Sequence, residues 1–229
     1  MRDSRLDLPF RLARGAEKEL AIAGIPLVLA VTAAIVWPRL YTVLLAGLFI
    51  ALFAVLLHFF RDPKRTPPTG EGVFLAPADG QVVEIRQVHE PGFLGGEALK
   101  VGIFMSLSNV HVNRAPVGGQ VVLVEHVPGQ FLQAFRPEAS EVNEHNLVGL
   151  ETGYGRVLVK QIAGILARRV VCWVRPGQRL EAGERLGVIK FGSRVEMYLP
   201  LGAHPFVRVG EQVHAGITVV ARWKGGEAE

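Results

Sequence analysis

The sequence predicts a mainly β protein, a flattened β-barrel or sandwich, that carries two long helices near its N-terminus. Three observations carry this prediction. Two uncharged apolar runs occupy residues 20–37 and 40–60. Beyond residue 72, short runs rich in Val, Ile and Leu are separated by glycine and proline, which is typical of strands. A glycine-containing motif then occurs twice in the C-terminal part of the chain.

Composition and charge exclude some classes of partner. The chain has 229 residues, of which 49% are hydrophobic, and its mean hydropathy of +0.29 is high for a soluble protein. The net charge is +4, but only 8% of residues are aromatic and no run of Arg and Lys is interleaved with them. The basicity therefore predicts attraction to an anionic surface, with no nucleic acid as partner. The single cysteine, Cys172, lies in an apolar run and is expected in the core.

The two apolar runs predict a helical hairpin in a membrane. As helices they would be roughly 27–31 Å long, about the thickness of a bilayer's hydrocarbon core. Trp37-Pro38-Arg39 breaks the pattern between them, and Arg61, Lys64 and Arg65 follow the second run. Positive outer flanks place both ends, and the rest of the protein, on the cytoplasmic side of the cell (inner) membrane. A shallow re-entrant hairpin is the alternative. A signal peptide is disfavoured because no small-residue cleavage site closes the first run.

The remaining domain organisation follows from this hairpin. Residues 1–19 form a basic N-terminal segment, 20–60 the hairpin, 61–71 a proline-containing linker and 72–229 a β domain. Strands are expected at 81–88, 99–105, 120–127, 156–162, 169–174, 188–191, 195–199 and 217–223. A turn of helix is expected within 139–146.

An internal repeat indicates the kind of β domain. Val174–Ile189 and Val207–Ala221 share V-R-x-G-x-x-[LV]-x-A-G, with the second copy 33 residues after the first. Strands that turn twice on glycine in this way resemble the hammerhead units of biotinyl- and lipoyl-carrier barrels, and Pro77–Val83 resembles their opening strand. The two copies flank the dipeptide Gly192-Ser193.

Gly192-Ser193 allows a self-cleavage reaction. Glycine permits a backbone with φ > 0, and its carbonyl is not covered by a Cβ atom. Attack of Ser193 Oγ on that carbonyl would move the acyl group from nitrogen to oxygen. β-Elimination of the ester would then cut the chain, and loss of ammonia would leave a pyruvoyl group. A plain Gly-Ser turn between strands is the other interpretation of the dipeptide taken alone.

A set of motifs in order resembles the short form of the phosphatidylserine decarboxylase proenzymes. The motifs are His58-Phe-Phe-Arg-Asp-Pro63 with Pro67-Pro68, Ala76-Pro-Ala-Asp-Gly80, His111-Val-Asn-Arg-Ala-Pro116 and Phe191-Gly-Ser-Arg194, followed by the glycine-containing tail 207–221. The resemblance implies self-cleavage between Gly192 and Ser193. The products would be a β chain, 1–192, and an α chain of 37 residues, 193–229, that stay together as a heterodimer. Assembly of this heterodimer into a higher oligomer is left as an open alternative.

The resemblance also implies the reaction and its residues. The pyruvoyl group made from Ser193 would form a Schiff base with phosphatidylserine, release CO2 and yield phosphatidylethanolamine, with no metal or diffusible cofactor. The self-cleavage set would be Asp79, His111 and Ser193. Longer relatives carry H-x-x-H where this chain has His111 and Arg114, so the identity of the base is open. Arg114 and Arg194 are candidates for the substrate's phosphate or carboxylate, although Arg194 fits a charge on the sheet surface equally well.

Two other classes of protein remain open on the sequence. A membrane-anchored carrier or adaptor without catalysis would need a modified lysine at a hairpin tip, whereas Lys190 lies inside a predicted strand. A hydrolase that uses Ser193 in an uncut chain would be expected to show a G-x-S-x-G elbow, which the sequence lacks.

Overall fold

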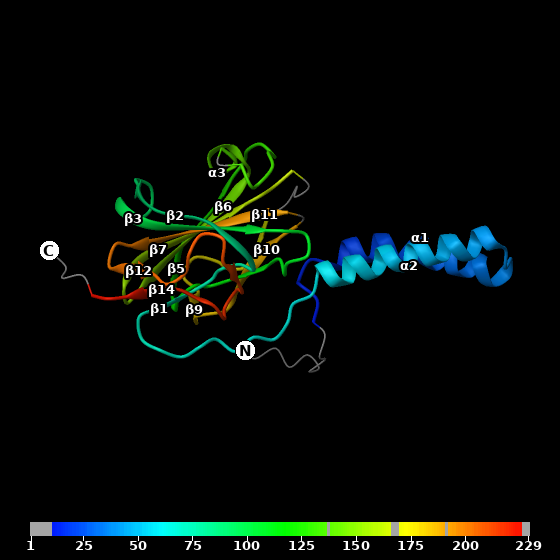
Figure 1. Cartoon of the computed structure of the whole chain (residues 1–229), viewed down its shortest axis with the longest axis horizontal. Helices are drawn as coiled ribbons and strands as arrows, with labels where there is room; N and C mark the ends of the chain where they lie inside the picture. Colours follow the sequence, from blue (N-terminus) through cyan, green and yellow to red (C-terminus); the bar gives the residue numbers. More distant parts are fainter. Residues whose placement is uncertain (1–10, 137, 166–169, 191, 226–229) are drawn as a thin grey trace. The chain divides into compact units, whose positions relative to one another are not determined.

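The structure is a computed structural model that describes residues 11–136, 138–165, 170–190 and 192–225. The chain separates into two compact units, Met1–Lys64 and Arg65–Glu229. Figure 1 shows that the first unit is helical and the second is built from strands.

The first unit holds two helices, α1 (Glu17–Val36) and α2 (Leu40–Phe59), which lie side by side (Figure 1). The turn between them is closed by Thr42, whose hydroxyl shares its one proton between the carbonyls of Trp37 and Arg39, both at 2.8 Å, and accepts from the Arg39 N–H at 3.1 Å. Both helices are long and apolar enough to cross a membrane by length and composition. The predicted pair of apolar helices is thereby confirmed.

The second unit is mainly β. Its strands are β1 (Val73–Leu75), β2 (Gly80–Glu90), β3 (Gly96–Met105), β4 (Val112–Arg114), β5 (Gly119–Val127), β6 (His145–Thr152), β7 (Gly155–Ile162), β8 (Val170–Cys172), β9 (Arg179–Leu180), β10 (Arg185–Ile189), β11 (Ser193–Pro200), β12 (Ala203–Pro205), β13 (Gln212–Val213) and β14 (Val219–Trp223). Eight of them form a curled antiparallel half-barrel in the order β13-β2-β3-β11-β7-β6-β5-β9. Two three-stranded sheets, β1-β14-β12 and β4-β10-β8, complete the unit around one apolar core.

Strand β11 lies in the middle of the eight-stranded sheet. It pairs with β3 from Ser193 opposite Met105 to Pro200 opposite Ala98, and with β7 on its other side. The strand predicted at 195–199 lies within it. β11 is buried on both faces, because its outer face carries charged side chains that are themselves covered.

The unit contains a longer duplication than the C-terminal repeat alone indicated. Residues 76–83 (APADGQVV) match 115–122 (APVGGQVV), 39 residues later. Each segment accepts two hydrogen bonds from glycines of one copy of the C-terminal repeat. In the first segment, Gly216 N–H donates to Ala76 O (2.9 Å) and Gly210 N–H donates to Val82 O (2.8 Å). At the matching positions of the second segment, Gly183 N–H donates to Ala115 O (2.8 Å) and Gly177 N–H donates to Val121 O (2.7 Å). The four repeat glycines all have positive φ, which explains why the motif requires glycine there.

One expected element in this region is confirmed, and one strand was missed. The helical turn expected in 139–146 is α3 (Ala139–Val142), and residues from His145 onward form β6, a strand that the sequence analysis missed. The reason is that Gly149 interrupts the apolar run. A Cβ there would contact the Phe93 ring at 2.7 Å, so glycine is required by packing and does not mark a turn.

Candidate functional site

Ser193 begins β11 and is completely buried. Its hydroxyl donates to the sulfur of Met105, its partner across the β3–β11 pair, at 3.3 Å. The preceding Gly192 has φ +62°, in the left-handed region that favours glycine. Gly192 thus leads into β11 with the positive φ that glycine permits, while Phe191 lies outside the described residues.

A row of buried polar side chains continues from Ser193 along the core face of the sheet. Met105 Sδ also accepts from Asn113 Nδ2 at 3.6 Å, and Asn113 Oδ1 accepts from Gln161 Nε2 at 2.7 Å. Within the described part of the chain, the Oε1 atom of Gln161 is buried and has no hydrogen-bond partner. Met105, Asn113 and Gln161 were not predicted as site residues from the sequence. Asn113 lies inside a quoted motif, whereas the only signal for Gln161 was a polar residue in an apolar strand.

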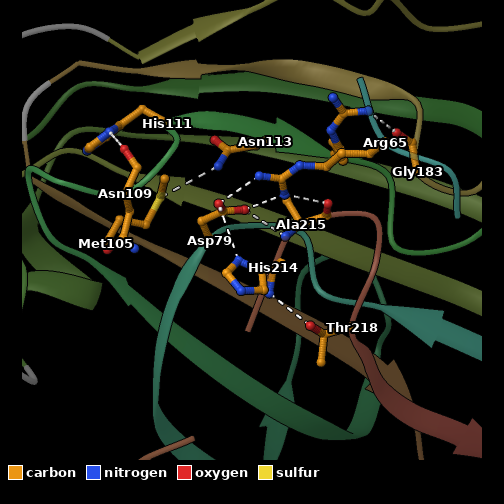
Figure 2. Close-up of polar contacts among 11 residues, drawn as sticks. Arg65, Asp79, Met105, Asn109, His111, Asn113, Gly183, His214, Ala215 and Thr218 are labelled. Carbon is orange, nitrogen blue, oxygen red and sulfur yellow. Dashed lines mark hydrogen bonds and ion pairs between the residues drawn. The ribbon is translucent and has the colours of Figure 1, made fainter. Parts of the chain in front are cut away.

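His111 precedes β4 and is almost fully buried. Its Nδ1 lies 2.9 Å from the carbonyl oxygen of Asn109. A carbonyl only accepts, so Nδ1 carries the proton and, in the neutral ring, Nε2 is the basic nitrogen. Figure 2 shows the ring beside Asn109, near Met105 and Asn113. The turn that leads to His111 leaves β3 directly after Met105, the residue opposite Ser193 in the β3–β11 pair.

Asp79 lies in a different environment. Its carboxylate accepts two hydrogen bonds from the Arg65 guanidinium, at 2.5 and 2.7 Å, and one from the Ala215 N–H at 2.8 Å. His214 Nδ1 lies 3.6 Å away (Figure 2). Arg65 also donates to the Ala215 carbonyl, so this ion pair joins the start of the second unit to the C-terminal repeat. The described contacts of the Asp79 carboxylate do not include His111.

The duplication supplies an internal comparison for Asp79. In the matching segment 115–122 the corresponding residue is Gly118, yet the backbone bonds of the two copies are the same. The fold of this turn therefore does not require a carboxylate. The Asp79 carboxylate makes an interaction that Gly118 cannot make, namely the ion pair with Arg65.

Arg65→Met is expected to destabilise the second unit by about 3–5 kcal/mol, because Asp79 would remain charged, buried and without its cation. Arg86→Met is the matched control. Arg86 also pairs with a carboxylate, Glu84, but its side chain is exposed, so its loss is expected to cost about 0–1 kcal/mol. Denaturant unfolding of the two variants in detergent compares them. Equal midpoints would show that the Arg65–Asp79 pair contributes little.

The two candidate arginines are both engaged. Arg114 donates to the Gly183 carbonyl at 2.9 Å. Arg194 follows Ser193 directly, so its side chain points to the opposite, outer face of the sheet. There it pairs with Glu84 and, through Nε at 2.7 Å, with Glu196. Gly102 leaves space for the guanidinium, since a Cβ at Gly102 would lie 2.9 Å from it.

These charges belong to a buried network on the outer face. Lys100 lies 3.0 Å from Glu196 and 3.2 Å from Glu84, while Ser140 and Tyr198 each donate to Glu196 at 2.8 Å. Burial by itself would raise the pKa of Glu196, but Arg194, Lys100 and the two hydrogen bonds hold that pKa below its ordinary value. Glu196 therefore stays ionised. The hydrogen bond from Ser140 to Glu196 also holds α3 against the outer face of the sheet.

His145 is buried at the start of β6. Its Nδ1 lies 2.7 Å from the Asn143 carbonyl oxygen. Burial lowers the pKa of His145, and the hydrogen bond to Asn143 only partly opposes this. The ring is accordingly neutral near pH 7. Among the described residues, no group of three or more His, Cys, Asp and Glu side chains could hold a metal ion.

Comparison with known proteins gives a consistent result. A family model described as phosphatidylserine decarboxylase matches residues 52–221. Phosphatidylserine decarboxylase proenzymes of two organisms are similar over 179 residues, 78% of this chain: that of Symbiobacterium thermophilum is 50% identical with 81% of its length covered, and that of Carboxydothermus hydrogenoformans 48% identical with 84% covered. The proenzyme of Pelobacter propionicus is 47% identical over 189 residues, covering 80% of this chain and 85% of that protein.

Proposed function

This chain belongs to the phosphatidylserine decarboxylase family, and from that premise we propose which of its residues make and use the reactive group. The chain is a pyruvoyl-dependent phosphatidylserine decarboxylase that is made as a proenzyme. Family membership therefore decides against the carrier and hydrolase alternatives.

Ser193 is the proposed source of the pyruvoyl group. The position fits the group because a β-hydroxyl directly follows a glycine with left-handed backbone, inside a site that is buried from water. Once formed, the group supplies a ketone that takes up the electrons released when the substrate's carboxylate leaves as CO2. Buried surroundings suit this chemistry, since water would compete for the reactive carbonyl.

The self-cleavage steps balance with the groups of the chain and one water. Ser193 Oγ attacks the Gly192 carbonyl carbon and loses its proton to a base. The C–N bond breaks, the nitrogen takes up a proton, and an ester joins the two parts. Loss of the Ser193 Cα proton expels the Gly192 carboxylate and leaves dehydroalanine. Its tautomer adds water and releases ammonia, which gives the pyruvoyl group at the new N-terminus.

His111 is the proposed base. Support comes from its burial, from the Asn109 carbonyl that leaves Nε2 as the basic nitrogen, and from its place on the turn that follows Met105, the residue opposite Ser193. We propose that Asp79 acts at a distance from His111. Its bonds to Arg65 and Ala215 fix the segment that also carries Pro77, whose carbonyl accepts a hydrogen bond from the Arg114 N–H at 2.9 Å.

The two arginines receive different assignments. Arg114 remains the candidate for the substrate's phosphate or carboxylate, because it belongs to the same short segment as His111. Arg194 is assigned to the sheet instead. Its side chain lies on the face opposite Ser193 Oγ and is paired with Glu84 and Glu196, so substrate binding would require that network to open.

The strand order explains how the two proposed chains stay together. Cleavage before Ser193 would place β11 to β14 in the 37-residue α chain. Of these, β11 lies between β3 and β7, and β14 pairs with β1. Both would remain hydrogen-bonded to the β chain. We propose that the duplicated units are hammerheads of the biotinyl-lipoyl kind, because matching glycines and matching backbone bonds recur in both copies.

The apolar helices indicate membrane association. We propose that they cross the inner membrane as a hairpin and leave the β unit on the cytoplasmic side, because the outer flanks are basic. A lipid substrate can then be used without leaving the bilayer.

A carbonyl-directed reagent tests the proposed reaction. Purified full-length protein is expected to convert phosphatidylserine in mixed micelles to phosphatidylethanolamine and CO2. Pre-treatment with phenylhydrazine should abolish conversion, because the reagent condenses with the ketone, and the added mass should reside on the 37-residue fragment. Full activity after treatment, or modification of the larger fragment alone, would contradict the proposal.

A further inference from the structure

Gly164 lies directly against the bond that the proposed function cuts. It is buried, two residues after β7. A Cβ built on Gly164 would lie well under 3.0 Å from the carbonyl oxygen of Gly192 and 3.1 Å from its carbonyl carbon. The next neighbour is the Cβ of Ala134, at 3.3 Å. Only the hydrogens of a glycine therefore fit beside the scissile carbonyl.

The backbone around Gly164 is held on two sides. Asn143, which is fully buried, donates from Nδ2 to the carbonyls of Ala163 and Leu132, both at 2.8 Å, and accepts the Leu132 N–H at 2.8 Å. The Ala163 N–H in turn donates to the Glu144 carbonyl at 2.9 Å. Gly164 thus directly follows a residue, Ala163, whose backbone N–H and carbonyl are both hydrogen-bonded. A carbonyl that rests against it cannot rotate or shift toward that side.

We propose that Gly164 is a positioning residue for self-cleavage: it forms the wall against which the Gly192 carbonyl oxygen rests, and so keeps the carbonyl carbon aimed at Ser193 Oγ. The reaction requires attack at a defined angle on a carbonyl whose backbone would otherwise be free to rotate about the glycine. Contact on one side of the oxygen restricts this rotation without adding a side chain to the site. The inference rests on the proposed cut between Gly192 and Ser193.

Gly164→Ala is the test. The added methyl must displace the Gly192 carbonyl, and a displacement of about 1 Å costs roughly 100-fold in rate. We therefore expect the fraction cleaved to rise about 100-fold more slowly during cell-free synthesis into lipid nanodiscs, measured by gel shift. Gly119→Ala is the matched control, because its Cβ would also meet a backbone oxygen, that of Glu151 at 2.6 Å, and because β5 is separated from β11 by β7 and β6. Gly153→Ala, with nothing within 4 Å of its Cβ, controls for the substitution itself.

Two further readouts separate positioning from general damage to the fold. Uncut Gly164→Ala protein should unfold at a temperature no lower than that of the Gly119→Ala protein. Hydroxylamine, which cleaves esters, should not cut the Gly164→Ala chain, because the substitution stops the reaction before the ester forms. Normal cleavage of Gly164→Ala, an equal loss of cleavage in Gly119→Ala, or accumulation of a hydroxylamine-sensitive ester would each overturn the inference. If the wild-type chain itself is not cut before Ser193, the proposed function fails, and not only the role of Gly164.

Discussion

Ser193→Ala is expected to leave the chain whole and to abolish decarboxylation. Without Oγ there is no nucleophile for the Gly192 carbonyl, no ester and no source of the ketone, so both losses should be complete within detection. The fold should survive, because the hydroxyl contributes a single hydrogen bond, to a thioether, which is a weak acceptor. The measurement is a gel of purified protein together with phosphatidylethanolamine formed from phosphatidylserine.

Ser140→Ala serves as the matched control for this experiment. Ser140 is also buried and also donates one hydrogen bond, but to Glu196 on the outer face of the sheet. Its loss should cost about 1 kcal/mol of stability and leave cleavage intact. A whole, uncut Ser193→Ala chain that still decarboxylates its substrate would refute the pyruvoyl assignment.

His111→Ala is expected to stop the cut or to slow it by about 100- to 10,000-fold, the usual contribution of a positioned general base. A serine hydroxyl is a poor nucleophile until a neighbour takes its proton, and His111 presents Nε2 as its basic nitrogen. The time course of cleavage after cell-free synthesis measures the effect. Arg114→Ala, three residues later, should be cut normally, and it tests lipid turnover separately.

Asp79→Asn is informative beside His111→Ala. If Asp79 acts by holding Arg65, then Arg65→Met should slow cleavage to a similar extent, and the pH dependence of cleavage should be unchanged. If Asp79 instead stabilises a protonated histidine, only Asp79→Asn should shift that pH dependence. Normal cleavage of His111→Ala would remove His111 from its role. His145 would be the next candidate, since its lowered pKa keeps the ring neutral.

Local pattern was sufficient for much of the fold. The two apolar runs became α1 and α2 with the break at Trp37–Arg39, because length and the lack of charge determine such helices. Strands β2, β3, β5 and β7 begin and end within a few residues of their expected positions. The repeat glycines predicted the turns, because each one needs a positive φ. β6 was missed because its glycine is required by contact with Phe93, which lies far away in the sequence.

The site was less predictable, and for a physical reason. Gly192 and Ser193 are adjacent, so their chemistry is visible in the sequence, whereas the partners of that pair come from distant strands. Met105 and Gln161 reach the site through sheet register, and Gly164 through a close approach of two backbones. The ion pair between Asp79 and Arg65 similarly joins residues whose separate motifs gave no sign that they meet.

The intact mass of the purified full-length protein is the most direct test of the cut between Gly192 and Ser193. Two species are expected, one of 192 residues and one of 37, with the smaller beginning at position 193 and lighter by one ammonia than the same peptide with a free N-terminal serine. A single species with the mass of the whole chain, in a preparation that converts phosphatidylserine to phosphatidylethanolamine, would contradict it.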